Sequence, residues 1–134
     1  MLLILTLLNN FLTLETKKTL VLGASLKPDR YSNFAIKRLL NSGYEVVAYG
    51  LKPGNVDGVR VATELLPFED IHTITLYLSS KHQEPYYKYI ISLNPKRVIF
   101  NPGTENPELF KILEENNIDY EIACTLVLLS TNQY

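Results

Sequence analysis

A short stretch of the sequence, residues 23–33, combines residue types that bind phosphate. It reads GASLKPDRYSN and joins an apolar run ending at Gly23 to a helical pattern. Arg30 can hold a phosphate through two donors at once, and the hydroxyls of Ser25 and Ser32 can donate to it as well. A helix N-terminus adds unpaired backbone amides and a partial positive charge. We therefore predict an anion site in this loop, with the amides of residues 23–25 among its donors.

The same loop lacks the GxGxxG fingerprint of dinucleotide-binding proteins, because Gly23 is its only glycine. It is also longer than the usual dinucleotide turn. The alternative interpretation is an ordinary connection between a strand and a helix, in which Ser32 or Asn33 caps the helix.

A second loop, residues 50–55, bears on which nucleotide fits. NAD-binding domains usually place an acidic residue here, where it binds the ribose hydroxyls. This sequence instead reads GLKPGN, and its first acid after the preceding strand is Asp57. Lys52 would attract a phosphate on the ribose, which coenzyme A carries at the 3′ position and NADP at the 2′ position. Lys52 thus argues against NAD and leaves coenzyme A, NADP and an ordinary surface lysine open.

The sequence shows no catalytic or metal-binding set of side chains near these loops. His82 follows a predicted strand, but no nucleophile or partner acid is identifiable beside it. Cys124 is the only cysteine, which excludes an internal disulfide, a CxxC redox centre and a cysteine-rich zinc site. We interpret Cys124 as a small buried hydrophobe, with a mixed disulfide to coenzyme A as the alternative.

An alternation of strand-like and helix-like segments positions these loops. Apolar runs predict strands, and apolar residues three and four positions apart predict helices. Gly43, Asn94-Pro95 and Asn106-Pro107 mark helix ends. The predicted strands are 19–23, 45–50, 59–62, 73–80, 96–100 and 118–122, the predicted helices are 33–42, 84–93 and one that begins at 107, and residues 124–131 fit either type.

This alternation is typical of a parallel sheet with helices on both faces. With right-handed crossovers, it predicts a Rossmann-like, doubly wound α/β fold with a mainly parallel sheet of five to six strands. A ligand of such a sheet binds beyond the carboxyl ends of the strands, where the strand order reverses. The loops expected to meet there are 23–33, 50–55, 79–83 and 101–106.

The composition fits one folded domain. The chain has 134 residues, of which 46% are hydrophobic and 20% charged, and this balance excludes a disordered or collagen-like protein. The net charge of −1 predicts no general affinity for nucleic acid or acidic membranes. A single cysteine is consistent with a reducing cytoplasm, where we expect the protein to reside.

Residues 1–16 form a leucine-rich leader ahead of the predicted domain, residues 17–134. The apolar run is shorter than the roughly 20 residues of a membrane span, and two asparagines interrupt it. It lacks the basic start and the cleavage site of a signal peptide. Ile4, Leu8 and Phe11 are spaced for a short helix on the domain or on a partner chain. The other interpretation is a start codon assigned too far upstream.

The segment GASLKPDRYSNFAIKRLLNSGYEVVAYGLKP, residues 23–53, resembles the opening of the small stand-alone CoA-binding-domain proteins. Those proteins carry a strand, the motif G-A-S-x-K-P-x-R-x-S, a helix and a G-Y-x-V strand. The same domain is similar to the N-terminal part of the succinyl-CoA synthetase α subunit. The resemblance covers residues 17–126 and implies a Rossmann-like fold that binds coenzyme A, usually without established catalytic activity.

The resemblance also implies which residues contact the coenzyme. In the family the loop after the fourth strand borders the ligand, which brings in Ser79 and Ser80. Asn101-Pro102-Gly103 replaces a Gln-Pro-Gly turn of the family, and Lys52-Pro53 replaces Asn-Pro. The expected coenzyme-binding residues are Gly23, Ala24, Ser25, Lys27, Pro28, Arg30, Ser32, Asn33, Lys52, Pro53, Ser79, Ser80, Asn101 and Gly103.

We therefore expect a protein that binds coenzyme A or an acyl-CoA without catalysing a reaction. An NADP-binding enzyme or redox sensor is the first alternative, although no acid or base for a hydride site is identifiable. A ligand-free interaction domain is the second, with a homodimer formed through the leader. Tyr87 and Tyr89 belong to a helix whose apolar side faces inward, or else they form a dimer contact. Neither a membrane span nor a nucleic-acid partner is expected.

Overall fold

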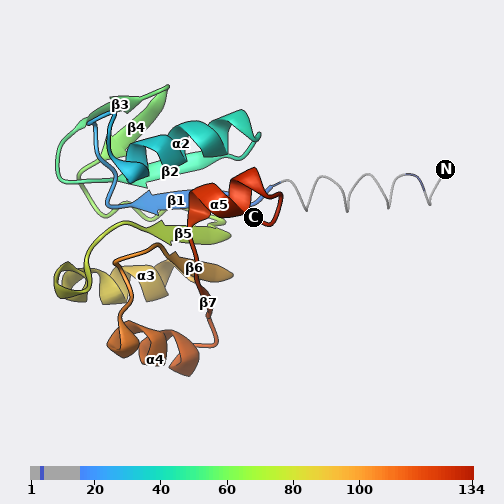
Figure 1. The fold of residues 1–134 in the computed structure, drawn as a ribbon. Helices are drawn as coiled ribbons and strands as arrows, with labels where there is room; N and C mark the ends of the chain where they lie inside the picture. Colours follow the sequence, from blue (N-terminus) through green and yellow to red (C-terminus); the bar gives the residue numbers. More distant parts are fainter. Residues whose placement is uncertain (1–3, 5–15) are drawn as a thin grey trace.

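The computed structural model describes Ile4 and residues 16–134, so the expected leader helix through Leu8 and Phe11 lies outside the described residues. The described part of the chain forms a seven-stranded sheet with helices packed against it (Figure 1). The strands are β1 (Thr19–Leu22), β2 (Val46–Tyr49), β3 (Gly54–Val56), β4 (Val59–Ala62), β5 (Thr73–Leu76), β6 (Arg97–Phe100) and β7 (Asp119–Ile122), and the α-helices are α2 (Tyr31–Asn41), α3 (Tyr87–Leu93), α4 (Pro107–Glu115) and α5 (Thr125–Ser130).

The strand order is β3-β4-β2-β1-β5-β6-β7. All neighbouring strands pair in parallel except β3, which runs antiparallel to β4. The chain moves outward from β1 through β2 to β4, returns to the centre, and then moves outward the other way from β5 to β7. The order therefore reverses between β1 and β5, and the predicted Rossmann-like, doubly wound fold is confirmed.

The expectation of five to six strands was too low, because β3 escaped it. Gly54 and Asn55 of β3 are exposed, so this edge strand has no apolar run to reveal it. It pairs with β4 through a turn at Asp57 and Gly58, whose φ angles are +49° and +90°. An Asp-Gly pair between two valines is a recognised hairpin signal, and it was the clue in the sequence.

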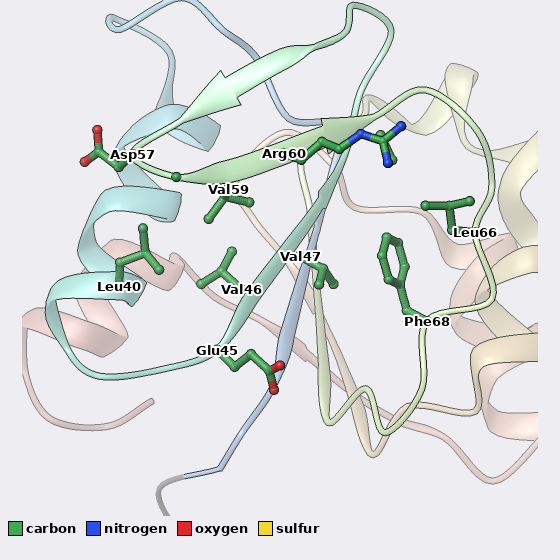
Figure 2. A pocket seen from close by; sticks show the side chains of 11 residues that line it. Leu40, Glu45, Val46, Val47, Asp57, Val59, Arg60, Leu66 and Phe68 are labelled. Carbon is green, nitrogen blue, oxygen red and sulfur yellow. The ribbon is translucent and has the colours of Figure 1, made fainter.

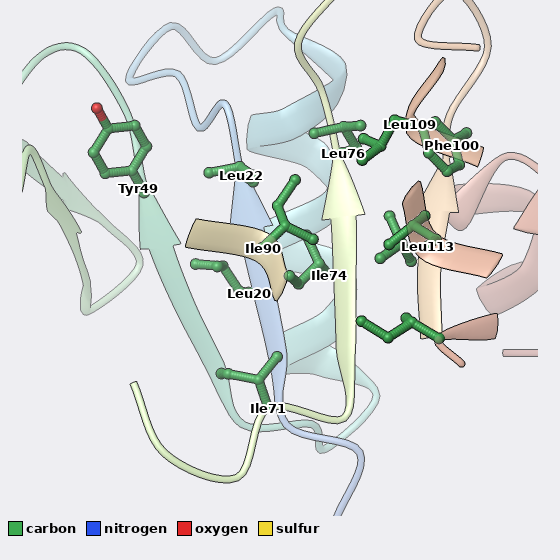
Figure 3. Packing of buried hydrophobic residues seen from close by; sticks show 12 residues of the cluster. Leu20, Leu22, Tyr49, Ile71, Ile74, Leu76, Ile90, Phe100, Leu109 and Leu113 are labelled. Atoms are coloured by element: carbon green, nitrogen blue, oxygen red, sulfur yellow. The ribbon is translucent and has the colours of Figure 1, made fainter. Parts of the chain in front are cut away.

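Each face of the sheet buries its own layer of apolar side chains. Leu20, Leu22 and Ile74 face α3 and α4, where Ile90 of α3 packs over β1 and β5 (Figure 3). On the opposite face, Ile36 and Leu39 of α2 pack in a second cluster that includes side chains of α5. The central strands β1 and β5 are buried along their whole length, which rigidly fixes the loops that follow them.

Several helix ends lie where the sequence places them. Gly43 follows α2 with φ +87°, and Asn94 ends α3 with φ +46°, both in the left-handed region. The side chain of Asn106 accepts hydrogen bonds from the amides of Glu108 and Leu109, as predicted for a helix cap. Each of these helix ends depends on the conformation or the side chain of one glycine or asparagine, so the sequence reveals it directly.

Other boundaries differ from the prediction. Helix α2 begins at Tyr31, and its cap residue is Arg30, so neither Ser32 nor Asn33 caps it. Strand β5 ends at Leu76 rather than at 80. The helix predicted from 84 is α-helical only from Tyr87, because two single 3₁₀ turns, Ser80–His82 and Glu84–Tyr86, precede it. The ambiguous tail is helix α5.

The tyrosines of α3 point into the molecule. Tyr87 accepts a hydrogen bond from Asn106 Nδ2 at 2.8 Å, and the Tyr89 hydroxyl donates to the Leu66 carbonyl at 2.5 Å. Both rings pack against the core, which supports the inward-facing helix over the dimer contact. Within the described residues, no helix has both the length and the apolar character needed to cross a membrane.

Candidate functional site

The carboxyl ends of β1, β2, β5 and β6 surround a cleft of about 790 Å³. It lies over the point where the strand order reverses, which is where doubly wound sheets bind ligands. Its walls come from the loops after those four strands, together with Tyr86. The predicted residues that line it are Gly23, Ala24, Ser25, Lys27, Pro28, Arg30, Ser32, Lys52, Ser79 and Gly103.

Two glycines allow the loops of the cleft to approach one another. Gly23 has φ +99°, and a Cβ there would lie 3.0 Å from the backbone of Tyr77. A Cβ on Gly50 would lie 2.3 Å from the carbonyl oxygen of Ala24, which is closer than van der Waals contact allows. The loop after β1 is therefore packed backbone to backbone against the ends of β2 and β5, and glycine is required at both positions.

The three amides predicted to hold phosphate are already engaged within the protein. The amides of Gly23 and Ala24 both donate to the Tyr49 carbonyl, at 3.0 and 2.8 Å. The Ser25 amide donates to Ser32 Oγ at 3.1 Å. In this structure these amides fold the loop against β2, and their contact with a ligand stays a prediction.

The amides at the start of α2 are the available ones. Among the described residues, no protein group accepts a hydrogen bond from the backbone amide of Tyr31 or Ser32. The Arg30 side chain makes no capping hydrogen bond, and this exposed residue also lines the cleft. Helix α2 thus presents free donors and the positive end of its dipole beside a free guanidinium, a combination that stabilises an anion.

Four of the predicted residues do not line the cleft. Pro53 and Ser80 lie outside its walls. Asn33 is buried, and its Nδ2 donates to the Ser25 carbonyl at 2.9 Å. Asn101 is also buried: its Nδ2 donates to Thr75 Oγ1 and the Leu76 carbonyl, and its Oδ1 accepts from the Thr125 amide.

These hydrogen bonds correct the roles that were expected of the two asparagines. Asn33 holds the loop after β1 from within, whereas Asn101 joins the ends of β5 and β6 to the start of α5. Both side chains stabilise the walls from behind. The turn that Asn101 begins has the predicted form, because Gly103 has φ +90° and the Thr104 amide donates to the Asn101 carbonyl at 3.0 Å.

Aromatic side chains in the cleft were missed from the sequence. The hydroxyls of Tyr49 and Tyr86 lie 3.2 Å apart, and their rings meet edge to face. The hydrogen bond to Tyr86, followed by burial, raises the pKa of Tyr49 to about 12. Burial also raises the pKa of Tyr77 to about 12. All three tyrosines line the cleft, and the two with raised pKa values remain protonated at neutral pH.

The sequence could have indicated two of these tyrosines by their places at strand ends, because Tyr49 ends β2 and Tyr77 directly follows β5. Cys124, by contrast, is not among the residues that line the cleft. It is half-buried, precedes α5 and lies outside the walls of the cleft, which favours a packing role over a mixed disulfide there.

Charge is distributed unevenly along the cleft. Lys27, Arg30 and Lys52 line the part formed by the loops after β1 and β2. The part formed by the loops after β5 and β6 is lined by uncharged residues, among them Ser79, Gly103 and Thr104. Among the described residues, no carboxylate lines either part. The cleft therefore suits a ligand with an anionic end and a neutral end.

A second hollow, of about 430 Å³, lies between β2 and β4 and beneath the segment that carries Leu66 and Phe68 (Figure 2). Its walls are largely apolar, and Val46 and Val59 face each other across it. The charged residues described there are Arg60, Glu45 and Asp57. With two carboxylates and one guanidinium among its lining residues, the hollow has no excess of positive charge, so it is a poor site for a nucleotide.

The sequence of residues 17–130 matches the family model described as CoA binding domain. The chain belongs to this CoA-binding domain family. The match spans all four loops that form the cleft. No protein among the curated ones matches the sequence.

The chain is also similar to several solved structures. A crystal structure of an uncharacterized protein has 48% sequence identity and a TM-score of 0.87, covering 89% of this chain and 98% of its own. A hypothetical protein from Pyrococcus horikoshii OT3 has 30% identity and a TM-score of 0.78, covering 92% and 87%. The cell-free ID.343 protein from Thermus thermophilus, at 20% identity and a TM-score of 0.80, covers 96% and 98% and shares the fold.

Proposed function

We propose that this protein binds coenzyme A or an acyl-CoA in the cleft over the strand reversal, without catalysing a reaction on it. Membership in the CoA-binding domain family supports coenzyme A as the ligand. The observation that carries the proposal is the distribution of charge, with Lys27, Arg30 and Lys52 in one part of the cleft and uncharged residues in the other. Coenzyme A has the same polarity, since its nucleotide end is anionic and its pantetheine arm is neutral.

The phosphates would bind at the start of α2 rather than at the amides of residues 23–25. The free amides of Tyr31 and Ser32 and the side chain of Arg30 would hold the diphosphate. Lys52, on the loop after β2, would face the 3′-phosphate of the ribose. The pantetheine arm would extend along Ser79 and Gly103 toward the ends of β5 and β6.

A binding role without catalysis fits the chemistry of the walls. Among the lining residues that the structure describes, no carboxylate, histidine or cysteine is present to serve as a base or nucleophile. The tyrosines with raised pKa values, Tyr49 and Tyr77, are poor bases at neutral pH. A single cysteine further supports residence in a reducing cytoplasm.

A thermal-shift comparison of coenzyme A, NADP and NAD tests the ligand. A compound that binds only the folded state stabilises it by about 2.7 kcal/mol at a hundred times its Kd. We expect coenzyme A to raise the melting temperature, and NADP and NAD to leave it unchanged. A shift with NADP alone would establish the alternative, and no shift with any of them would support an interaction domain. Release of free thiol from acetyl-CoA should not exceed the rate without protein.

A further inference from the structure

One buried side chain connects the two loops at the uncharged part of the cleft. Gln83 is 0% exposed. Its Nε2 donates to the carbonyl of Leu78 at 2.8 Å and to the carbonyl of Thr104 at 2.7 Å. Leu78 follows β5 and Thr104 follows β6, and both residues line the cleft. Gln83 thus joins two walls that are far apart in the sequence.

The orientation of Gln83 is fixed by a third hydrogen bond. Its Oε1 accepts from Asn106 Nδ2 at 2.9 Å, and the same Nδ2 donates to the Tyr87 hydroxyl. Asn106 also caps α4, where its Oδ1 accepts from the amides of Glu108 and Leu109. Both ends of the Gln83 amide therefore have the partners that their chemistry requires, and the group is held from α3 and α4.

Besides the hydrogen bonds of Asn101 to Thr75 and Leu76 at the end of β5, Gln83 holds the loop after β6 against the loop after β5. Thr104 closes its own turn, donating through both its amide and its hydroxyl to the Asn101 carbonyl. The bond from Gln83 to the Thr104 carbonyl then ties that closed turn to Leu78. A buried amide with three partners is costly to disrupt, because each loss leaves a polar group without water or protein to satisfy it.

We infer that Gln83 is a positioning residue that fixes the spacing of the walls around the neutral arm of the ligand. This inference rests on the proposed function. Gln83 does not line the cleft, so its effect reaches a ligand only through Leu78 and Thr104. The cationic part of the cleft is built from other loops and does not depend on it. Loss of Gln83 should therefore weaken contacts to the pantetheine arm and spare contacts to the phosphorylated nucleotide.

The test compares two ligands by calorimetry. Coenzyme A carries the arm, and adenosine 3′,5′-bisphosphate carries the nucleotide without it. Gln83→Met keeps the length of the side chain and removes all three hydrogen bonds. Asn106→Asp keeps the helix cap and replaces the donor to Gln83 Oε1 with a carboxylate oxygen, and it is the second variant if Gln83→Met does not fold. We expect either variant to lose about tenfold in affinity for coenzyme A and less than twofold for the bisphosphate.

Thr19→Val is the matched control. Thr19 is also fully buried and hydrogen-bonded, to the Tyr134 hydroxyl at 2.6 Å, but it lies at the opposite end of β1 from the cleft. It should lower the melting temperature and leave both affinities unchanged. Hydrogen exchange of the ligand-free proteins should show faster exchange in residues 78–83 and 101–106 for the Gln83 variant, and no change there for the control.

Equal losses for the two ligands, or unchanged affinities with unchanged exchange, would overturn the role of Gln83. Wild-type protein that binds neither ligand would overturn the proposed function, and hydrogen exchange would then decide whether Gln83 links the two loops. Faster exchange in both loops with no binding would locate the failure in the choice of ligand, because the link between the loops would then stand.

Discussion

The two hollows of this protein differ in what their walls can hold. The cleft at the carboxyl ends of the central strands is lined by Lys27, Arg30 and Lys52, whereas the lining of the hollow between β2 and β4 includes Arg60 together with two carboxylates, Glu45 and Asp57. The amides of Tyr31 and Ser32 at the start of α2, which border the cleft, also have no acceptor among the residues that the structure describes. Both hollows are open and partly apolar, so shape alone does not distinguish them. Free hydrogen-bond donors and uncompensated positive charge distinguish the cleft from the hollow, and both occur where the strand order reverses.

The largest expected effect is the loss of coenzyme A binding when Arg30 is truncated. Arg30→Ala removes a charge-assisted contact worth about 1.5–3 kcal/mol, which is roughly a ten- to hundredfold loss of affinity. Arg60→Ala is the matched control, because it removes an exposed arginine from the other hollow. It should leave the affinity unchanged. Calorimetric titration measures both, and equal losses in the two variants would abolish the distinction between the hollows.

Substitution of Gly50 should lower the free energy of unfolding by an amount similar to the binding energy lost at Arg30. Gly50→Ala places a Cβ 2.3 Å from the carbonyl oxygen of Ala24, so the loop after β1 must shift. Overpacking of this kind costs about 1–3 kcal/mol, and it should also weaken coenzyme A binding, because Ala24 lies in the wall of the cleft. Thermal unfolding and titration check the two effects.

Gly58→Ala tests the effect of backbone strain at a glycine that lies outside the cleft. Gly58 has φ +90° in the hairpin between β3 and β4 and no neighbour within 4 Å of an added Cβ. Its substitution should lower the melting temperature through backbone strain alone and leave coenzyme A affinity intact. A Gly50 variant with normal affinity would show that the close contact with Ala24 does not shape the cleft.

A smaller loss of affinity should show whether Lys52 contacts the 3′-phosphate of the ribose. Lys52→Ala should weaken coenzyme A about threefold and leave 3′-dephospho-CoA unaffected, because an exposed charge pair contributes less than about 1 kcal/mol. Lys81 is also exposed but lies outside the cleft, so Lys81→Ala is the control. Competition binding with the two coenzymes measures the difference. Equal losses for both would place Lys52 away from the 3′-phosphate.

The smallest effect concerns pH at the amino end of the sheet. Burial, and then the charges of Arg97, Lys17 and Lys96, lower the pKa of His72. The unfolded chain therefore binds a proton more readily than the folded one, and stability falls as the pH drops below about 6.5. His72→Gln should make the melting temperature less sensitive to pH from 6.5 downward. An unchanged pH profile would contradict this, and coenzyme A affinity at pH 7 should stay the same.

The sequence predicted the parts of the fold that follow from local chemistry. The buried strand β1 is largely an apolar run, and the cap at Asn106 is a local signal. The pairing of β3 was missed because its exposed residues carry no pattern apart from the Asp57-Gly58 turn. The end of β5 was also predicted wrongly. The strand ends at Leu76 and not at residue 80, and the loop toward Gln83 begins there.

The site was harder to predict, because its details depend on contacts between distant segments. Arg30 and Lys52 were expected and line the cleft. The amides of Gly23 and Ala24 were expected to be free, but the Tyr49 carbonyl, on another strand, accepts from both. Asn101 was expected to face the ligand, and it lies beneath the wall instead. Sequence position identifies the loops that line the cleft and does not determine which way a polar group points.

The central claim is that coenzyme A occupies the carboxyl-end cleft with its phosphates at the start of α2. The most direct test is to titrate coenzyme A into the ¹⁵N-labelled full-length protein and to follow its amide resonances. We predict the largest shifts at residues 25–32 and 50–52, with smaller ones at 77–79 and 102–104. Shifts concentrated at residues 45–47 and 57–60, around the other hollow, would contradict the claim, as would an unchanged spectrum in excess coenzyme.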